Sequence, residues 1–181
     1  LGVLVVERDA QPMGTTAMST GLIPAAGSAI QRAHGVDDSP QRFAEDILRK
    51  TKGKVDQALV AHLARESART VDWLAGEHGV ALSLVEGFTY PGHSALRMHG
   101  MPSRSGGELM GALASACEDA GVDILTSSLV DTLYVDDADR VIAIAALRPD
   151  GARDVIGCGA LILACCGFAG NAAMVRELIP E

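Results

Sequence analysis

Near the start of the sequence, the apolar stretch Val3-Leu-Val-Val6 leads into Glu7-Arg-Asp9. A stretch rich in small residues follows, Gln11-Pro-Met-Gly-Thr-Thr-Ala-Met-Ser-Thr-Gly-Leu-Ile-Pro-Ala-Ala-Gly27. Residues 3–6 are apolar without alternation, which predicts a strand buried on both faces, as in a parallel sheet. The second stretch is too irregular for a strand, and loops of its length in compact domains are usually functional. A buried strand followed by such a loop predicts an α/β fold whose loop lies against a ligand.

The composition excludes several classes of protein. The chain has 181 residues, 15 Lys plus Arg against 23 Asp plus Glu, and a formal net charge of −8. A nucleic-acid binder or a basic membrane-surface module needs a basic face, so this balance argues against both. Because 48% of the residues are hydrophobic, an intrinsically disordered chain is also excluded. The length fits one domain or two small ones.

The sequence shows no targeting or membrane segment. No apolar run approaches the roughly 20 residues that a membrane helix needs, and no signal peptide is evident. We therefore predict a cytoplasmic protein without a membrane segment. Because the chain starts at Leu1 and enters an apolar strand almost at once, we expect it to be a fragment of a longer protein.

The four cysteines are Cys117, Cys158, Cys165 and Cys166. Their spacing fits neither a disulfide framework nor a paired zinc site, so we predict no metal site. We expect Cys165 and Cys166 to be small apolar residues on a buried strand, since free cysteine is usually buried. A redox or metal role for this adjacent pair is the alternative.

Two or three helices follow the first loop. Ser39-Pro40 is a helix start signal, and an apolar stripe at helical spacing runs from about Val55 to residues 76–79. Residues 87–107 contain five glycines and two each of proline, histidine and arginine, which predicts a polar loop. Residues 35–105 are therefore predicted to form a helical insert followed by a polar loop.

The last third of the chain returns to strands. Residues 108–120 predict a helix that ends before Gly121. Strands are expected at residues 122–126, 130–135, 141–147 and 155–156, and the last three form a small antiparallel meander.

A continuous apolar run, residues 159–164, predicts one more buried strand before a final helix. We divide the chain into residues 1–34, the first strand and the ligand loop; 35–105, the insert and polar loop; and 106–181, the return to the first domain with the meander.

Glu7 ends the first strand, where a dinucleotide-binding βαβ unit carries a carboxylate that binds a ribose. The glycine fingerprint of such a unit would lie before Leu1. The alternative is a solvated charge at a strand end.

Several segments, in order along the chain, resemble the flavoprotein family of fumarate reductases and succinate dehydrogenases, which includes the 3-ketosteroid dehydrogenases. The matching segments are Val5-Val-Glu-Arg8, Met13 to Gly21, Ala25-Ala-Gly27, Asp72-Trp-Leu74, Arg97-Met-His99 with Pro102, Gly106 and Gly107, Gly121-Val-Asp-Ile124, Val130, residues 136–140, and Ala164-Cys-Cys-Gly-Phe-Ala-Gly-Asn171. The resemblance implies a partial Rossmann-like FAD-binding domain with a helical insert.

The resemblance also implies which residues contact FAD. Glycine and small hydroxyl residues let backbone amides approach a pyrophosphate or a flavin ring closely. The implied contacts are Glu7, Arg8, Gly14, Thr15, Thr16, Ser19, Thr20, Gly21, Ala25, Gly27, Val130, Ala164, Cys165, Cys166 and Gly167. In this set Val130 would present its backbone to the adenine, and residues 164–167 would pass near the adenosine.

Three positions depart from the family pattern. Met13, Thr20 and Cys166 stand where the family favours glycine. Thr20 and Cys166 suit these places only if their φ angles are negative.

Arg97 and His99 have two interpretations. They are substrate-side candidates, because reduction of a dicarboxylate needs cations and a proton donor; the alternative is a hydrogen-bonded loop structure. The family's principal catalytic histidines and arginine lie beyond Glu181, so no catalytic residue is carried over. The substrate and the electron donor or acceptor stay unidentified.

What the resemblance implies for the whole protein is an FAD-dependent oxidoreductase that transfers a hydride between flavin and a C–C bond of a small-molecule substrate. By itself the fragment should lack turnover. The alternative is a noncatalytic module that no longer binds FAD. A hydrolase is disfavoured, because no Gly-x-Ser-x-Gly elbow occurs.

Overall fold

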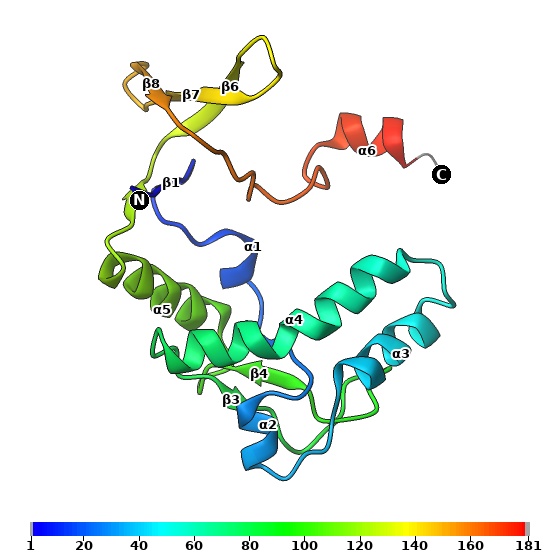
Figure 1. Ribbon diagram of the computed structural model, residues 1–181. Coiled ribbons are helices and arrows are strands. Elements are labelled where there is room, and N and C mark those ends of the chain that lie inside the picture. Colours follow the sequence, from blue (N-terminus) through cyan, green and yellow to red (C-terminus); the bar gives the residue numbers. More distant parts are fainter. Residues whose placement is uncertain (1, 180–181) are drawn as a thin grey trace. The chain divides into compact units, whose positions relative to one another are not determined.

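A computed structural model describes residues 2–179 (Figure 1). The chain forms two compact units, Leu1–Thr126 and Ser127–Glu181, which we call unit 1 and unit 2. Helices and strands are mixed, so the predicted α/β class is confirmed. The segments predicted from the sequence, residues 1–34, 35–105 and 106–181, are defined by their expected roles, whereas the two units are defined by their internal contacts. The three segments therefore stay a prediction.

The first strand of unit 1 is parallel to the last. β1 (Leu4–Val6) pairs with β5 (Asp123–Leu125) in parallel, as a strand rich in β-branched residues suggests. The predicted burial on both faces is wrong, since Leu4 and Val5 are each 39% exposed. The reason is that this sheet has two strands within the described part of the chain, too few to cover either face.

The long loop after β1 contains regular structure that its irregular sequence did not predict. One helical turn, α1 (Gly14–Ala17), is followed by β2 (Ile23–Pro24). A three-stranded antiparallel sheet has the order β2-β4-β3, with β4 (Met98–Gly100) between β2 and β3 (Ser83–Leu84). Part of the polar loop predicted at residues 87–107 is thus the strand β4, which pairs with β2 in the first loop.

Four helices of unit 1, α2 to α5, start at side-chain caps, whereas the turn α1 has none. Ser28 caps α2 (Ala29–Ala33), and Ser39 caps α3 (Pro40–Lys50), which has proline at its start. The Asp56 carboxylate accepts hydrogen bonds from two amides at the start of α4 (Gln57–Gly76). Ser105 caps α5 (Gly106–Asp119), and Gly121 follows it with a positive φ. The helices predicted after the first loop are confirmed by α3 and α4.

The apolar core of unit 1 is small. One cluster contains Ala26, Phe43 and Ala64, and the other contains Val80, Met101 and Leu109. Unit 1 therefore buries few large apolar side chains, and its other buried residues include charged and polar ones.

Unit 2 contains the predicted meander. β6 (Leu129–Val135), β7 (Val141–Leu147) and β8 (Arg153–Gly157) form an antiparallel sheet in chain order, and α6 (Ala172–Leu178) ends the described chain. The Asp136 amide donates to the Arg140 carbonyl oxygen at 3.0 Å, which closes the first hairpin.

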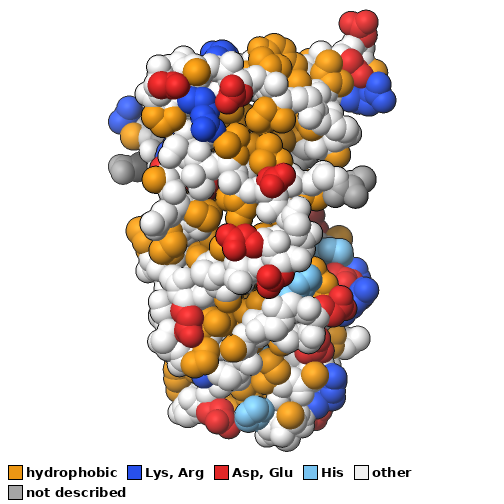
Figure 2. All heavy atoms as spheres, turned by 90° about the vertical axis from the view of Figure 1, so that its left-hand side faces the viewer, with side chains coloured by type: hydrophobic (Ala, Val, Ile, Leu, Met, Phe, Trp, Pro, Cys, Tyr) orange, Lys and Arg blue, Asp and Glu red, His pale blue; other side chains and the backbone are white. Residues whose placement is uncertain are grey.

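The strand predicted at residues 159–164 is wrong. These residues have no strand partner in the part of the chain that is described, and Ile162 and Leu163 are 87% and 68% exposed. The predicted burial of Cys165 and Cys166 is also wrong, because both are exposed. Apolar side chains lie on the surface of this unit, at the top of Figure 2. An apolar run becomes a buried strand only where another strand pairs with it.

Candidate functional site

Glu7 stands at the end of β1, as predicted. Its amide donates to the Leu125 carbonyl oxygen at 2.8 Å, which continues the ladder with β5. Its half-buried carboxylate accepts a hydrogen bond from the Asp9 amide at 2.8 Å. Arg8 is exposed and pairs with Asp9 at 3.0 Å. The Glu7 carboxylate keeps acceptor capacity, because one carboxylate can accept several hydrogen bonds.

The helical turn α1 presents unused hydrogen-bond donors. Gly14 has φ +54°, and an added Cβ would meet nothing within 4 Å, so the space beside it is open. The amides of Gly14, Thr15 and Thr16 make no hydrogen bond within residues 2–179, and all three residues are exposed. Three consecutive free amides suit anionic or carbonyl oxygens of a ligand.

The rest of this loop is held by internal contacts. The Ser19 hydroxyl donates to the Thr16 carbonyl oxygen at 2.7 Å and accepts from the Gly21 amide at 3.0 Å. Thr20 is exposed and its φ is not positive, which satisfies the condition set for a non-glycine residue there. Gly21 is buried with φ +62°.

Gly106 positions this loop, and sequence reasoning did not identify that role. Its amide donates to the Ser19 carbonyl oxygen at 2.9 Å. A Cβ on Gly106 would lie 1.8 Å from the Thr16 carbonyl oxygen, and a Cβ on Gly21 would lie 2.8 Å from the Gly106 Cα. The start of α5 therefore touches the loop backbone directly. From the sequence, Gly106 is expected in the polar loop of residues 87–107 and not at the start of a helix.

Ala25 and Gly27 face the interior of unit 1. The Ala25 amide donates to the Arg97 carbonyl oxygen at 2.9 Å, and the Gly27 amide donates to Gln31 Oε1 at 2.6 Å. Ala25 is fully buried. Both amides are therefore engaged within the protein, unlike those of Gly14 to Thr16.

Arg97 is buried among two carboxylates. Its Nε and Nη2 donate to the two oxygens of Asp38 at 2.7 and 2.8 Å, and its Nη1 donates to Asp46 Oδ2 at 2.8 Å. The guanidinium carbon lies 4.6 Å from the centre of the Phe43 ring. Asp46 also accepts from the amide and hydroxyl of Ser94 at 2.7 and 2.8 Å, and from Arg49.

Hydrogen bonds keep these groups charged despite burial. Burial alone would raise the pKa of the Asp38 and Asp46 carboxyl groups, but the hydrogen bonds from Arg97 outweigh it and hold both pKa values below their ordinary range. Burial would likewise lower the pKa of Arg97, and the two carboxylates raise it instead.

His99 is also fully buried. Its Nε2 lies 2.8 Å from the Ser28 hydroxyl, and its Nδ1 lies 3.0 Å from the Arg97 carbonyl oxygen. The carbonyl oxygen can only accept, so Nδ1 carries the proton and Nε2 accepts from Ser28. Burial lowers the pKa of His99, so the ring is neutral at pH 7. Arg97 and His99 thus have the contacts of the loop-structure interpretation.

These side chains form one continuous network. Ser28 contacts both His99 and Gln31, and the side-chain Nε2 of Gln31 donates to Asp38 Oδ2 at 3.0 Å. Asp38 in turn holds Arg97. We call the set the Arg97 network; its members are Ser28, Gln31, Asp38, Asp46, Arg97 and His99. Sequence reasoning identified only Arg97 and His99, because their partners carry no local signal.

The predicted site residues of unit 2 lie on β6 and after β8. Val130 is half-buried on β6. Ala164, Cys165, Cys166 and Gly167 are exposed. Cys166 has φ +66°, which contradicts the condition that a non-glycine residue there needs a negative φ. The backbone has the left-handed conformation that glycine favours, so Cys166 carries strain of about 1 kcal/mol.

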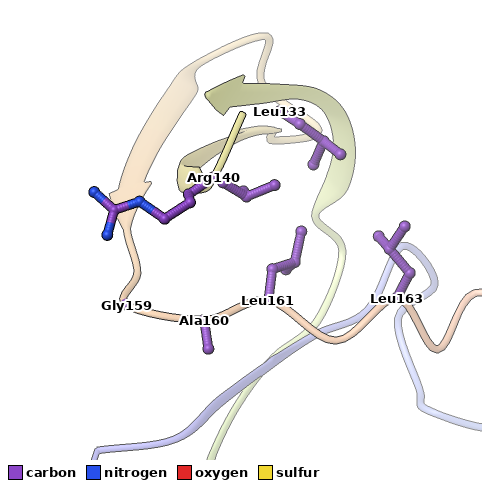
Figure 3. A pocket seen from close by; sticks show the side chains of 7 residues that line it. Leu133, Arg140, Gly159, Ala160, Leu161 and Leu163 are labelled. Carbon is purple, nitrogen blue, oxygen red and sulfur yellow. The ribbon is translucent and has the colours of Figure 1, made fainter. Parts of the chain in front are cut away.

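Unit 2 also has a pocket of about 330 Å³. Its lining is mostly apolar, from β6, β7 and residues 159–163. In Figure 3 the side chains of Leu133 and Leu161 point toward one another across it, whereas the Arg140 guanidinium points away. Arg140 donates to Asp136 at 2.7 Å, so its charge is already paired. The pocket therefore suits an uncharged apolar group.

Neither a metal cluster nor a membrane span is found in the part of the chain that the structure describes. Within residues 2–179, no group of three or more His, Cys, Asp or Glu side chains is arranged to hold a metal ion. No helix among those residues is long and apolar enough to cross a bilayer.

The chain resembles known proteins along its whole length. A family model described as "FAD binding domain" matches residues 1–181. The probable fumarate reductase Ifc3 of Shewanella frigidimarina (strain NCIMB 400) is 30% identical over 178 residues, which cover 98% of this chain and 30% of that protein.

Two solved structures have the same fold. The open conformation of a flavocytochrome c3 fumarate reductase matches with a TM-score of 0.79 and 25% identity, over 99% of this chain and 36% of that one. The 3-ketosteroid-Δ4-(5α)-dehydrogenase of Rhodococcus jostii RHA1 matches with a TM-score of 0.71 and 26% identity, over 86% of this chain and 38% of that one. The chain thus spans 30% to 38% of the length of these relatives.

Proposed function

Since the chain belongs to the family of FAD binding domains found in fumarate reductases and related dehydrogenases, with FAD as its cofactor, we propose that it serves an FAD-dependent oxidoreductase. Bound FAD supplies hydride transfer to or from a C–C bond of a small-molecule substrate. The residues described here would bind and orient the cofactor. The substrate-reducing activity belongs to the whole protein, and fumarate is the first substrate to test, because the relatives are named for it.

One observation carries the proposal. The turn that begins at Gly14 holds three consecutive amides, of Gly14, Thr15 and Thr16, that make no hydrogen bond within residues 2–179. Such amides stabilise phosphate oxygens by hydrogen bonding without the cost of reorganisation. The open space beside Gly14 leaves room for the cofactor to approach. The residues present therefore fit an FAD pyrophosphate or flavin edge.

Glu7, Arg8, Ser19, Thr20 and Gly21 complete the set proposed in unit 1. Glu7 stands where a carboxylate would accept hydrogen bonds from the FAD ribose. Ser19 and Gly21 hold the shape of the loop through the Ser19 hydroxyl. Ala25 and Gly27 would act indirectly, because their amides are engaged inside unit 1.

For unit 2 we propose that Val130 and residues 164–167 contact the adenosine part of FAD. The exposure of residues 164–167 leaves their backbone accessible to a ligand. An electron donor or acceptor and a cytoplasmic location stay predictions from the sequence.

A noncatalytic module that no longer binds FAD is the second candidate, and one observation favours it. Cys166 occupies a left-handed backbone position that suits glycine, and its thiol would lie in the proposed adenosine region. This candidate predicts that the chain folds and stays colourless.

Titration with FAD separates the two candidates. We expect flavin fluorescence to be quenched on binding, and Gly14→Ala to weaken binding about tenfold or more, since a Cβ occupies the open space and disfavours φ +54°. Gly35→Ala is the matched control: Gly35 also has a positive φ, +69°, and open space around it, but it follows α2. It should keep its affinity for FAD.

Equal weakening by both substitutions would show that the effect comes from backbone strain and would remove the turn from the site. A chain that folds but does not bind FAD would favour the noncatalytic module.

A further inference from the structure

Four of the six largest fully buried side chains belong to the Arg97 network: Arg97, His99, Gln31 and Ser28. Burying an arginine with two carboxylates is costly unless every charge is paired and hydrogen-bonded. The network meets that condition, since Arg97 donates to both Asp38 and Asp46. Such a cluster tolerates little displacement, because a small shift leaves a buried charge unpaired.

The network and one neighbouring side chain, that of Ser67, hold one short segment by its amides. Residues 25–28 belong to neither a helix nor a strand. The amide of Ala25 donates to the Arg97 carbonyl oxygen, and those of Gly27 and Ser28 donate to Gln31 Oε1. The Ala26 amide donates to the Ser67 hydroxyl at 3.2 Å. Every amide of this segment thus has a partner in the interior of unit 1.

This segment continues directly from the loop at residues 14–21. The loop ends at Gly21, and β2 then pairs with β4, the strand that carries His99. A Cβ on Gly100 would lie 2.5 Å from Leu22 Cδ2, so β4 also packs closely against the connection. Fixing residues 25–28 therefore fixes the C-terminal end of the loop at residues 14–21.

We propose that the Arg97 network is a positioning device for the cofactor loop, with Gln31 and Arg97 as positioning residues. The inference rests on the proposed function, since the loop is the proposed FAD contact. The buried carboxylates hold Arg97 and Gln31, these two hold residues 25–28, and that segment sets where the amides of Gly14 to Thr16 lie. Neither Arg97 nor Gln31 touches the cofactor in this arrangement.

Gln31→Met tests the proposal, since methionine has a similar volume and no hydrogen-bonding amide. We expect hydrogen exchange of the Gly27 and Ser28 amides to be at least about tenfold faster, the effect of losing a hydrogen bond of about 1.4 kcal/mol. FAD should bind about tenfold more weakly, with a changed visible circular dichroism of the bound flavin. Val60→Ala is the control, because Val60 is buried in α4 outside the network; it should destabilise the chain without either effect.

Gln31→Asn is the milder variant if Gln31→Met does not fold. It keeps the amide but shortens the side chain by one methylene, and it should shift both readouts in the same direction. The proposal is overturned if the two amides stay protected, or if they exchange faster while FAD affinity and the flavin spectrum match those of the Val60→Ala chain. Failure of the unsubstituted chain to bind FAD would instead reject the proposed function, and amide exchange would still decide whether the network holds residues 25–28.

Discussion

Residues 25–28 in unit 1 and residues 159–167 in unit 2 are both small or apolar, yet their structures differ. Residues 25–28 form no regular element, but all four of their amides are engaged, and Ala25, Ala26 and Ser28 are fully buried. Residues 159–167 resemble a strand in sequence, but they have no strand partner within the described chain and are largely exposed. Whether these segments are buried and hydrogen-bonded therefore depends more on partner residues far away in the sequence than on the local sequence pattern.

The largest test of this comparison removes a cation from each unit. Arg97→Met should lower the free energy of unfolding of unit 1 by about 3–5 kcal/mol, because two buried carboxylates lose their partner. Arg140→Met, in unit 2, should change stability far less, since Arg140 and Asp136 form an exposed pair. Urea unfolding followed by fluorescence of Trp73, the single tryptophan, measures unit 1, and far-ultraviolet circular dichroism of the same samples measures both units. Similar losses for the two substitutions would contradict the comparison.

The next test adds one methyl group where backbones touch. Gly106→Ala should cost about 1–3 kcal/mol, because the new Cβ would overlap the Thr16 carbonyl oxygen. Gly111→Ala, in the same helix, has nothing within 4 Å and should stabilise α5 by about 0.5–1 kcal/mol. Thermal unfolding of the two variants measures the difference. A harmless Gly106→Ala substitution would mean that the loop does not depend on α5.

A smaller effect depends on pH. Because burial lowers the pKa of His99 in the folded chain, below about pH 6.5 the unfolded chain binds a proton that the folded chain does not. The free energy of unfolding should therefore fall as pH drops from about 6.5 through the folded pKa, by at most about 1.4 kcal/mol per pH unit. Urea unfolding at several pH values should show a smaller dependence of the free energy of unfolding on pH in His99→Gln.

The Asp38 and Asp46 carboxylates affect stability only below about pH 4, where their protonation removes the charges that pair with Arg97. An identical slope above pH 4 in His99→Gln would exclude His99 as the source.

The smallest expected effect concerns strain in unit 2. Cys166→Gly should relieve the left-handed conformation and raise stability by at most about 0.5 kcal/mol, because the greater entropy of unfolded glycine offsets part of the relieved strain. Cys165→Gly is the matched control, because Cys165 has no positive φ and should lose stability. Differential scanning calorimetry measures both. A destabilising Cys166→Gly would mean that the thiol makes a contact worth more than the strain.

The elements with local signals could be predicted from the sequence. Ser39-Pro40 starts α3, a stripe of apolar residues forms α4, and the meander follows its turns. The sequence predicts a ligand-binding loop after β1 because glycine and threonine cluster there, and its contact with FAD stays a proposal. For Arg97 and His99 the sequence left two interpretations open.

The partners of Arg97 could not be predicted. Asp38 and Asp46 lie 59 and 51 residues away along the chain, with nothing in their neighbourhoods to distinguish them from surface acids. The contact between Gly106 and Thr16 could not be predicted either, because a glycine needed for close packing has no side chain that would contribute to a sequence pattern. The strand predicted at residues 159–164 is wrong because an apolar run is compatible with a buried strand but does not show that a partner strand is present.

The pairing of β1 with β5 has a consequence for how the chain folds. Leu4 pairs with Asp123, so this sheet closes only after almost all of unit 1 has been brought together, whereas β6, β7 and β8 are joined by short turns. Contacts between sequence-distant residues form slowly, and local hairpins form in microseconds. During synthesis β1 leaves the ribosome long before β5 is made, so its apolar residues stay unpaired and exposed until then. Each strand of the meander can pair with its neighbour as soon as that neighbour has left the ribosome.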